Sequence, residues 1–326
     1  MRFFQGKKDK QAGVAMSTSQ VPEDFLRGPP QNATVHHIDF TKTTPAILAF
    51  KDNFAAVIDN FMTENECTEL LQLAEKSMIP GPNTNAPVWE QAMINAGGGK
   101  QIMSVDSRKS GRIIFDSPDI AQRIFDRLQP FMRDFKLDKI HNRPPITGLG
   151  PAKRGETYHL SRLNERLRFL RYEGGDYFRP HWDGCYVTPD GNERSLLTIQ
   201  LYLNGDGKQD LAELLPEIER AEKKNALFVQ DGNVDLNNIL DDRPDSPAYA
   251  STAAESLKET GKLLGGATSF TDDYRAREVV RVFPKTGSIL IFQQRNLMHC
   301  GDDVFRGVKY TVRSDVMYTC ASESGN

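Results

Sequence analysis

The sequence predicts an α+β fold in which helices come first and short strands later form a sandwich or jelly roll. Residues 55–61 have strand character and lead into a capped helix, and a second helix pattern follows at residues 117–132. From residue 166 onward the apolar residues follow strand periodicity instead, in runs bounded by Gly, Pro, Asn or Asp. This order of elements, helices before strands, is typical of an α+β domain.

Both predicted helices begin with a recognisable cap. Thr63 followed by Glu66 forms a capping-box pattern, and apolar residues at helical spacing follow within residues 70–74. Ser117 is a suitable N-cap for the second helix, and Asp119 in its first turn complements the helix dipole. We therefore expect two amphipathic helices that support the strands.

Five later runs alternate or cluster apolar residues as strands do. They cover residues 166–172, 195–204, 279–284, 288–292 and 307–318. These runs are expected to build the β core.

The domain organisation follows from length and local composition. With 326 residues, the chain is long enough for one large core with additions. Residues 1–45 are polar and contain Pro29-Pro30, which predicts a flexible N-terminal arm. Residues 46–320 form the predicted main domain, and residues 321–326 a C-terminal tail.

An acidic insertion is predicted at about residues 205–264. Residues 209–262 hold twelve Asp or Glu against six Lys or Arg, and no clean strand pattern. Compact domains rarely contain so long a structureless loop, so we expect an insertion with short helices near residues 211–215 and 253–260.

Composition excludes several broad classes of function. The net charge is −3, which predicts no general attraction to nucleic acid or acidic membranes. Its four cysteines lie far apart without a C-x-x-C pair, so neither a zinc site nor a disulfide framework is expected. The first residues lack an apolar secretory core, and we find no apolar stretch of membrane-spanning length. We expect a cytoplasmic or nuclear protein.

The candidate metal ligands form an H-x-D motif with a distant histidine. His181 and Asp183, two residues apart in an extended segment, can present an imidazole and a carboxylate to one metal ion. A second H-x-D, His37 to Asp39, lies in the polar arm without a strand run after it, and we expect it to bind no metal. His299, at the end of a strand pattern, is the expected third ligand.

These motifs together resemble the catalytic domain of prolyl 4-hydroxylases, a group of 2-oxoglutarate oxygenases. The resemblance rests on the H-x-D motif, the GGATSF run at 265–270, the strand at 288–292, and the V-x-x-G-x-K pattern of residues 304–309 that follows His299. It extends to VIDNFMTENECTELLQLAE at 57–75. It implies a double-stranded β-helix, or jelly-roll, core and Fe(II) held by His181, Asp183 and His299.

The resemblance also implies how the cosubstrate is held. Lys309 would bind the distal carboxylate of 2-oxoglutarate, and Tyr172 would hydrogen-bond it. A lysine on a barrel strand is a buried cation that needs an anion, which supports this role. Arg313 lies on the same strand face and is the alternative anchor, and a solvent-facing strand would show the same alternation as residues 308–315.

The predicted activity is hydroxylation by an oxidoreductase that uses O2, releases succinate and CO2, and takes ascorbate as its reductant. A peptidyl, prolyl-like or small-molecule substrate is expected, since a fold constrains chemistry more than target. An AlkB-like nucleic-acid demethylase is one alternative, which the charge disfavours. A catalytically silent jelly-roll binding module is the other, which the intact ligand set disfavours.

Overall fold

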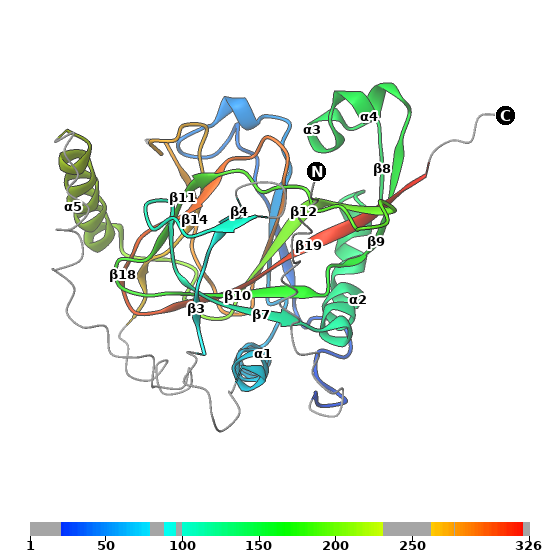
Figure 1. Cartoon of the computed structure of the whole chain (residues 1–326), viewed down its shortest axis with the longest axis horizontal. Helices are drawn as coiled ribbons and strands as arrows, with labels where there is room; N and C mark the ends of the chain where they lie inside the picture. Colours follow the sequence, from blue (N-terminus) through cyan, green and yellow to red (C-terminus); the bar gives the residue numbers. More distant parts are fainter. Residues whose placement is uncertain (1–20, 79–87, 96–99, 231–261, 277, 322–326) are drawn as a thin grey trace, which may run out of the picture.

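The computed structural model describes residues 21–78, 88–95, 100–230, 262–276 and 278–321, and within them every strand pairing is antiparallel. The main sheet has ten strands, and eight of them follow one path (Figure 1). In spatial order these are β1 (Thr34–His37), β2 (Ala55–Asp59), β16 (Ile289–Gln293), β12 (Glu193–Tyr202), β19 (Lys309–Ala321), β10 (Arg166–Tyr172), β7 (Gly111–Asp116) and β3 (Glu90–Gln91). Off this path, β9 (Thr157–Leu163) pairs with β19 and with β8 (Lys139–His141).

A second, five-stranded sheet carries most of the candidate site. Its order is β15 (Val280–Val282), β14 (Thr268–Phe270), β17 (His299–Gly301), β11 (Tyr177–His181) and β6 (Arg108–Lys109). Two ribbons complete the β part, β13 (Leu264–Gly265) with β18 (Val304–Arg306) and β4 (Ile94–Asn95) with β5 (Gln101–Ile102). The helices are η2 (Leu48–Phe50), α1 (Glu64–Ser77), α2 (Pro118–Asp134), α3 (Pro144–Thr147), α4 (Leu149–Lys153) and α5 (Leu211–Gln230).

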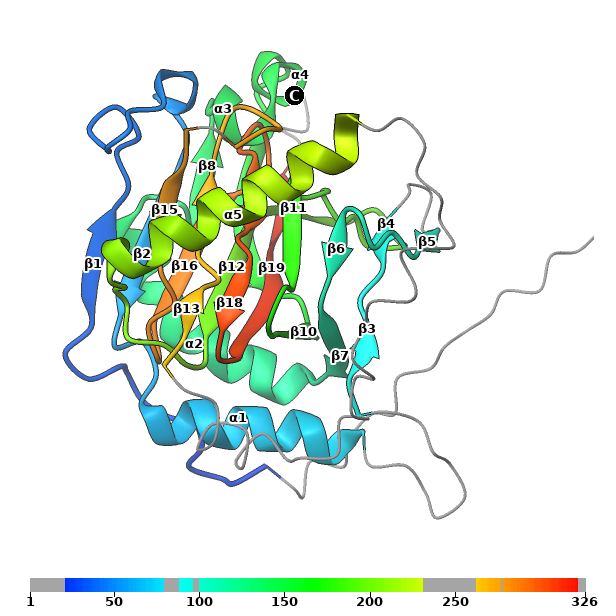
Figure 2. The same ribbon diagram turned by 90° about the vertical axis from the view of Figure 1, so that its left-hand side faces the viewer.

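The two predicted helices form, with the predicted caps. The Thr63 hydroxyl accepts from the Glu66 backbone N–H while the Glu66 carboxylate accepts from the Thr63 N–H, so α1 starts with a complete capping box. The Ser117 hydroxyl caps α2. The buried faces of both helices join residues of the main sheet in one large apolar core, which fixes them on one side of that sheet (Figures 1 and 2).

All five predicted strand runs contain strands of the structure. Residues 166–172 match β10, and the other four runs overlap β12, β15, β16 and β19. Periodicity identified them because their buried residues are dominated by Val, Ile, Leu and aromatic side chains. Shorter strands such as β6 and β11 were not predicted, since two to five mixed residues carry little periodic signal.

The two faces of the main sheet differ in chemistry. On β10, Leu167 and Phe169 face the helices and enter the large apolar core. Arg168 points to the other face, as does Arg313, its direct partner on β19. Hydrogen bonds from Gln200 and Tyr202 of β12 to Thr268 of β14 link this second face to the five-stranded sheet. The candidate site therefore lies between two sheets, on a polar inner face.

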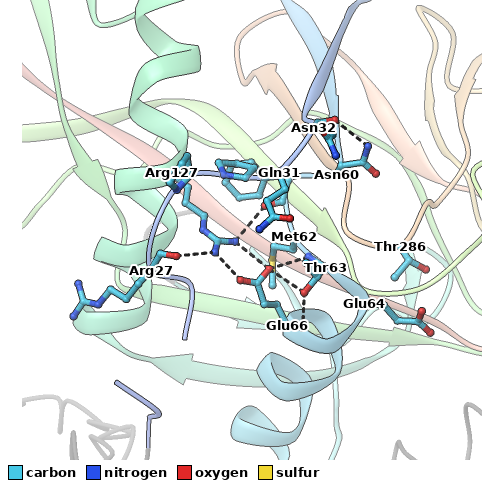
Figure 3. A pocket seen from close by; sticks show the side chains of 13 residues that line it. Arg27, Gln31, Asn32, Asn60, Met62, Thr63, Glu64, Glu66, Arg127 and Thr286 are labelled. Carbon is cyan, nitrogen blue, oxygen red and sulfur yellow. Dashed lines mark hydrogen bonds and ion pairs between the residues drawn. The ribbon is translucent and has the colours of Figure 1, made fainter. Parts of the chain in front are cut away.

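Residues 21–45 differ from the flexible arm that the sequence predicts. β1 pairs with β2, and Phe25, Leu26 and Phe40 are buried. Arg127 of α2 explains part of this order, because its guanidinium donates to the carbonyl oxygen of Gly28 at 2.9 Å. The same guanidinium forms an ion pair with Glu66 at 2.6 Å, which Figure 3 shows. Polar composition misled the prediction, since backbone carbonyls in this segment bind buried arginines. Residues 1–20 lie outside the described part.

The predicted insertion contains a longer helix than expected. The short helix near 211–215 is the start of α5, which lies away from α1 and α2 (Figure 1) and crosses in front of several strands in Figure 2. Glu213 of α5 forms an ion pair with Arg306 of β18. The helix expected near residues 253–260 lies outside the described residues.

Two composition-based expectations can be compared with the structure. The four cysteines are free thiols. Among the described residues, no helix is long and apolar enough to cross a membrane.

Candidate metal centre

The three predicted ligands come together at one end of the second sheet. His181 is the last residue of β11 and lies directly opposite His299, the first residue of β17. Asp183 follows two residues after His181, just beyond the strand rather than inside it. One potential ligand atom from each side chain lies within 4.8 Å of the others, and no other such group is found among the described residues.

Both imidazoles are oriented by backbone carbonyls. Nδ1 of His181 lies 2.9 Å from the carbonyl oxygen of Arg179, and Nδ1 of His299 lies 3.2 Å from that of Leu297. Because a carbonyl only accepts hydrogen bonds, each Nδ1 carries the proton and each Nε2 presents its lone pair. The two Nε2 atoms lie 3.9 Å and 3.7 Å from oxygens of Asp183.

The carboxylate is held from two sides. Its Oδ2 accepts a hydrogen bond of 2.6 Å from the Thr198 hydroxyl on β12. Its Oδ1 lies 2.9 Å from a guanidinium nitrogen of Arg313 on β19. Both contacts come from the inner face of the main sheet, so the two sheets jointly position Asp183.

The local field keeps these groups in metal-binding protonation states. Burial lowers the pKa of His181 to about 3 and also lowers the pKa of His299, so both rings are neutral at pH 7. For Asp183, burial acts to raise the pKa, but the Arg313 guanidinium and the hydrogen bond from Thr198 act to lower it, and the pKa falls below its usual range. Two neutral imidazoles and one carboxylate result, which is the donor set of a facial-triad metal site.

Lys309 lies deep on the inner face with no anionic partner. Its side chain is 1% exposed, and its ammonium lies 5.2 Å from the ring centre of Tyr172 and 5.8 Å from that of Tyr202. No ion pair or hydrogen bond joins it to a described residue. Burial lowers its pKa from 10.5 to about 8, although Asp302 and Cys300 act in the opposite direction. Such a cation is costly unless something else neutralises it.

Arg313 and Tyr172, the other predicted cosubstrate residues, have different surroundings. Arg313 already contacts Asp183 and also lies 3.3 Å from an oxygen of Asp315. Tyr172 pairs directly with Lys309 across β10 and β19, and its ring is buried. Of the two cations, Arg313 has carboxylate partners, whereas Lys309 forms no ion pair with the part of the chain that the structure describes.

The second H-x-D motif, His37 to Asp39, lies away from the three candidate ligands. His37 belongs to β1, and its ring packs edge-on against Phe135 at a centroid distance of 5.1 Å. Asp39 accepts hydrogen bonds from Thr41 and pairs with Lys42 on the surface. Neither residue lies with the three candidate ligands, as the sequence context predicts.

Trp182 corrects one expectation of the sequence. Strand alternation predicts that this side chain, placed between two candidate ligands, packs away from the metal. Instead it is 49% exposed, and its ring lies 5.5 Å from that of Tyr274. The reason is that β11 ends at His181, so alternation does not continue through Trp182.

Several residues around the centre escaped the sequence analysis. The ring of Phe178 stacks on His181 at 3.6 Å, and Arg108 lies 4.5 Å above Phe178. On β19, the hydroxyl of Thr311 is buried and has no hydrogen-bond partner. Strand alternation places Thr311 on the same face as Lys309 and Arg313, so the sequence could have predicted its position. Arg108 lies on a two-residue strand, which is too short to show a periodic pattern.

We compared the chain with known proteins. No family model and no curated protein sequence matches it. Among solved structures it is similar to prolyl hydroxylases. A viral collagen prolyl hydroxylase from Paramecium bursaria Chlorella virus-1, in complex with 2-oxoglutarate, has 16% identity and a TM-score of 0.38, with 81% of this chain and 96% of that chain covered.

Two further structures give the same picture. A prolyl-4-hydroxylase from Pseudomonas putida has 14% identity and a TM-score of 0.41, with 80% of this chain and 91% of that one covered. A prolyl hydroxylase from Trichoplax adhaerens, bound to a peptide fragment of hypoxia inducible factor, has 13% identity and a TM-score of 0.42, with 86% and 96% covered. The chain is thus similar to the same class of oxygenase that its motifs resemble. With TM-scores below 0.5 the likeness is distant, and the function proposed below rests on the residues of the site.

Proposed function

We propose that this chain is an Fe(II)- and 2-oxoglutarate-dependent dioxygenase that hydroxylates its substrate. One observation carries the proposal. Two neutral histidines and a carboxylate converge between two sheets, close to a buried lysine that lacks an anion. The histidines and the carboxylate suit a metal ion, and the lysine suits an anionic cosubstrate.

The donor set fits Fe(II). His181, Asp183 and His299 would supply two imidazole nitrogens and one carboxylate oxygen, which is the pattern of non-haem iron oxygenases. The backbone carbonyls that hold each Nδ1 and the Thr198 hydroxyl that holds Asp183 would orient these ligands. Three protein ligands leave further positions open for a cosubstrate and for O2.

The inner face of β19 fits 2-oxoglutarate. Lys309 would bind the distal carboxylate, because its ammonium is buried without a partner. The unpartnered hydroxyl of Thr311 lies two residues further on the same face and could donate to the same ligand. Tyr172 would line the site beside Lys309. Arg313 instead would hold Asp183 in place, because Asp183 and Asp315 already neutralise its charge.

When bound, iron and 2-oxoglutarate supply an oxidant from O2, with succinate and CO2 as products and ascorbate as the reductant that maintains Fe(II). The chain's own residues would bind, orient and exclude water. The stacked ring of Phe178 covers one face of His181, and the ring of Phe292 lies edge-on to His299 at 4.6 Å. These rings shield the centre and keep both imidazoles aligned.

The finer fold and domain assignments belong to the same proposal. The two facing antiparallel sheets would be the halves of a double-stranded β-helix, with α1 and α2 as outer support. We propose residues 46–320 as the catalytic domain, with an insertion at about 205–264 and a short tail at 321–326.

A peptidyl, prolyl-like substrate or a small molecule would fit the site. The similar Trichoplax enzyme holds a peptide. Here the rim beside the ligands exposes apolar side chains, including Trp182, Tyr186 and Tyr274, on which a substrate could pack.

Anaerobic titration tests the proposal. Adding Fe(II) and then 2-oxoglutarate should produce the visible charge-transfer band of the chelate, and O2 should then yield succinate. Asp183→Ala should lose the band because one ligand is missing. Thr188→Ala, which alters a surface turn hydrogen bond, serves as the matched control. Absence of the band in the native protein would contradict the proposal, and a band without succinate would indicate a binding module.

A further inference from the structure

The inner face of the main sheet carries more positive charge than the proposed reaction needs. Five cations, Lys309, Arg313, Arg168, Arg112 and Arg108, lie around the candidate centre, against four nearby carboxylates, those of Asp183, Asp315, Asp302 and the exposed Glu90. Fe(II) and 2-oxoglutarate, with charges of +2 and −2, would cancel each other. A surplus of cations therefore remains after the proposed cofactors are bound.

Strand register places these arginines side by side. Arg168 lies opposite Arg313, and Arg112 of β7 lies opposite Leu170, two residues along β10 on the same face. β7 and β19 are separated by two strand spacings, about 10 Å. The backbone of Arg112 therefore lies about three extended substrate residues away from that of Arg313.

Arg108 approaches from the second sheet. Its guanidinium lies 4.5 Å from the centre of the Phe178 ring, which itself stacks on His181. The pKa of Arg108 is affected by Tyr172, Arg313 and Asp183, which therefore lie near its guanidinium. Arg108 and Arg112 also repel each other. The two guanidiniums therefore lie near each other, one from each sheet.

Neither arginine forms an ion pair with a described residue, although the exposed Glu90 lies opposite Arg112 across β3 and β7 and Asp183 acts on Arg108 from a longer distance. Arg112 is 8% exposed, its Nε has no hydrogen-bond partner, and a second nitrogen donates to the Gln101 side chain at 3.2 Å. Arg108 donates through Nε to the Ser110 hydroxyl at 3.2 Å. Burial lowers the pKa of both arginines, which reflects the cost of their uncompensated charge.

Arg166, on the same face of β10, is an arginine whose charge is neutralised by a carboxylate of the chain. Arg166 forms two hydrogen bonds with the Asp116 carboxylate, at 2.8 Å and 2.7 Å. Arg168 likewise pairs with Asp315 at 3.0 Å. Arg166 and Arg168 thus form ion pairs with carboxylates of the chain, whereas Arg108 and Arg112 form none with the described residues.

From this arrangement we infer that the substrate carries a carboxylate, which binds to Arg108 and Arg112 beside the metal centre. The inference deepens the proposed function and rests on it. Guanidinium groups bind carboxylates through paired, directional hydrogen bonds, so the pair would both attract the substrate and set which carbon faces the metal. The carboxylate can come from an acidic side chain of a peptide or from a small free acid.

The test compares acidic probes with their neutral amides. Capped peptides with a central proline and Asp or Glu at each flanking position are matched with Asn and Gln peptides, and small carboxylic acids with their amides. Binding to the anaerobic Fe(II) and 2-oxoglutarate form is followed by fluorescence. Trp182 lies at the rim and is the exposed one of two tryptophans, since Trp89 is only 5% exposed.

We expect at least one acidic probe to bind roughly tenfold to a hundredfold more tightly than its amide, as a hydrogen bond to a charged group predicts. This advantage should fall to about threefold or less in Arg108→Gln and in Arg112→Gln. It should persist in the matched control Arg166→Gln, whose guanidinium is already neutralised. Arg108→Lys and Arg112→Lys, which keep the charge, should retain part of it.

Each contrary result has a distinct meaning. The chelate band is recorded first, and its absence overturns the proposed function. If the band forms but acidic and neutral probes bind the native protein equally, only this inference fails, and that comparison needs no variant to fold. A preference that survives in the Arg108→Gln, Arg112→Gln double variant also overturns it. Free acids that bleach the band are displacing 2-oxoglutarate at Lys309, and a preference confined to them likewise overturns the inference.

Discussion

Replacing Lys309 by methionine should make the protein more stable and less able to bind 2-oxoglutarate. Because burial lowers the pKa of Lys309 from 10.5 to about 8, keeping its ammonium protonated at pH 7 costs about 3 kcal/mol, at about 1.4 kcal/mol per pKa unit. Methionine has nearly the same length and no charge, so this cost disappears. The free energy of unfolding without cosubstrate should rise by up to about 3 kcal/mol.

The same substitution should weaken cosubstrate binding. A hydrogen bond to a charged group contributes about 1.5 to 3 kcal/mol, so the apparent Kd for 2-oxoglutarate should rise by roughly ten- to hundredfold. Stability is measured by urea unfolding of the ligand-free protein, and affinity by anaerobic titration of the chelate band. Iron affinity is measured separately in each variant.

Arg313→Met is the matched comparison. Arg313 pairs with Asp183 and Asp315, and because Asp315 keeps Arg168, its loss leaves the buried carboxylate of Asp183 without a cation and should lower stability by about 3 to 5 kcal/mol. The two methionine variants are thus expected to change stability in opposite directions. A destabilised Lys309→Met that binds 2-oxoglutarate almost normally, beside an Arg313→Met with a strongly raised Kd, would refute the assignment and make Arg313 the anchor.

Three further predictions follow from described contacts. Alanine at any one of the three candidate metal ligands should abolish 2-oxoglutarate turnover and weaken iron binding, whereas His37→Ala should leave both unchanged, and turnover that survives loss of His299 would contradict the ligand set. Arg127→Met should lower the free energy of unfolding, measured with urea, by about 3 to 5 kcal/mol because it leaves the Glu66 carboxylate without its cation. Arg133→Met, on the exposed side of the same helix, should change this free energy little. Between about pH 8 and 10.5 the unfolded chain binds a proton at Lys309 that the folded, ligand-free protein does not. The free energy of unfolding of the native protein should therefore rise with pH relative to that of Lys309→Met. Parallel curves of stability against pH for the two proteins would disprove the lowered pKa.

Much of the scaffold was predictable because it depends on local signals. The capping box of Thr63 and Glu66 marks the start of α1 without any tertiary information. β10 and β16 are recognisable because their buried residues form dense apolar runs. His299 was found for a similar reason, since it follows such a run, whereas His181 and Asp183 were found from their H-x-D spacing.

The parts that sequence could not provide depend on pairing between distant segments. Arg108 meets the site only because β6 pairs with β11, some seventy residues later in the chain. The contact between Arg313 and Asp183 likewise depends on how two sheets face each other. The packing of residues 21–32 was hidden because their backbone carbonyls bind two buried arginines of α2, Arg123 and Arg127, and not an apolar face.

The position of β19 has a consequence for folding. This strand lies between β12 and β10 in the main sheet, yet follows both in the chain. Until residues 309–321 insert, β12 and β10 each present an unpaired edge, and such edges recruit other chains. Lys309 and Arg313 belong to this strand, so the proposed cosubstrate can bind only to molecules in which β19 has paired with β12 and β10. An anion that neutralises Lys309 should therefore favour the closed sheet by mass action and suppress aggregation during refolding.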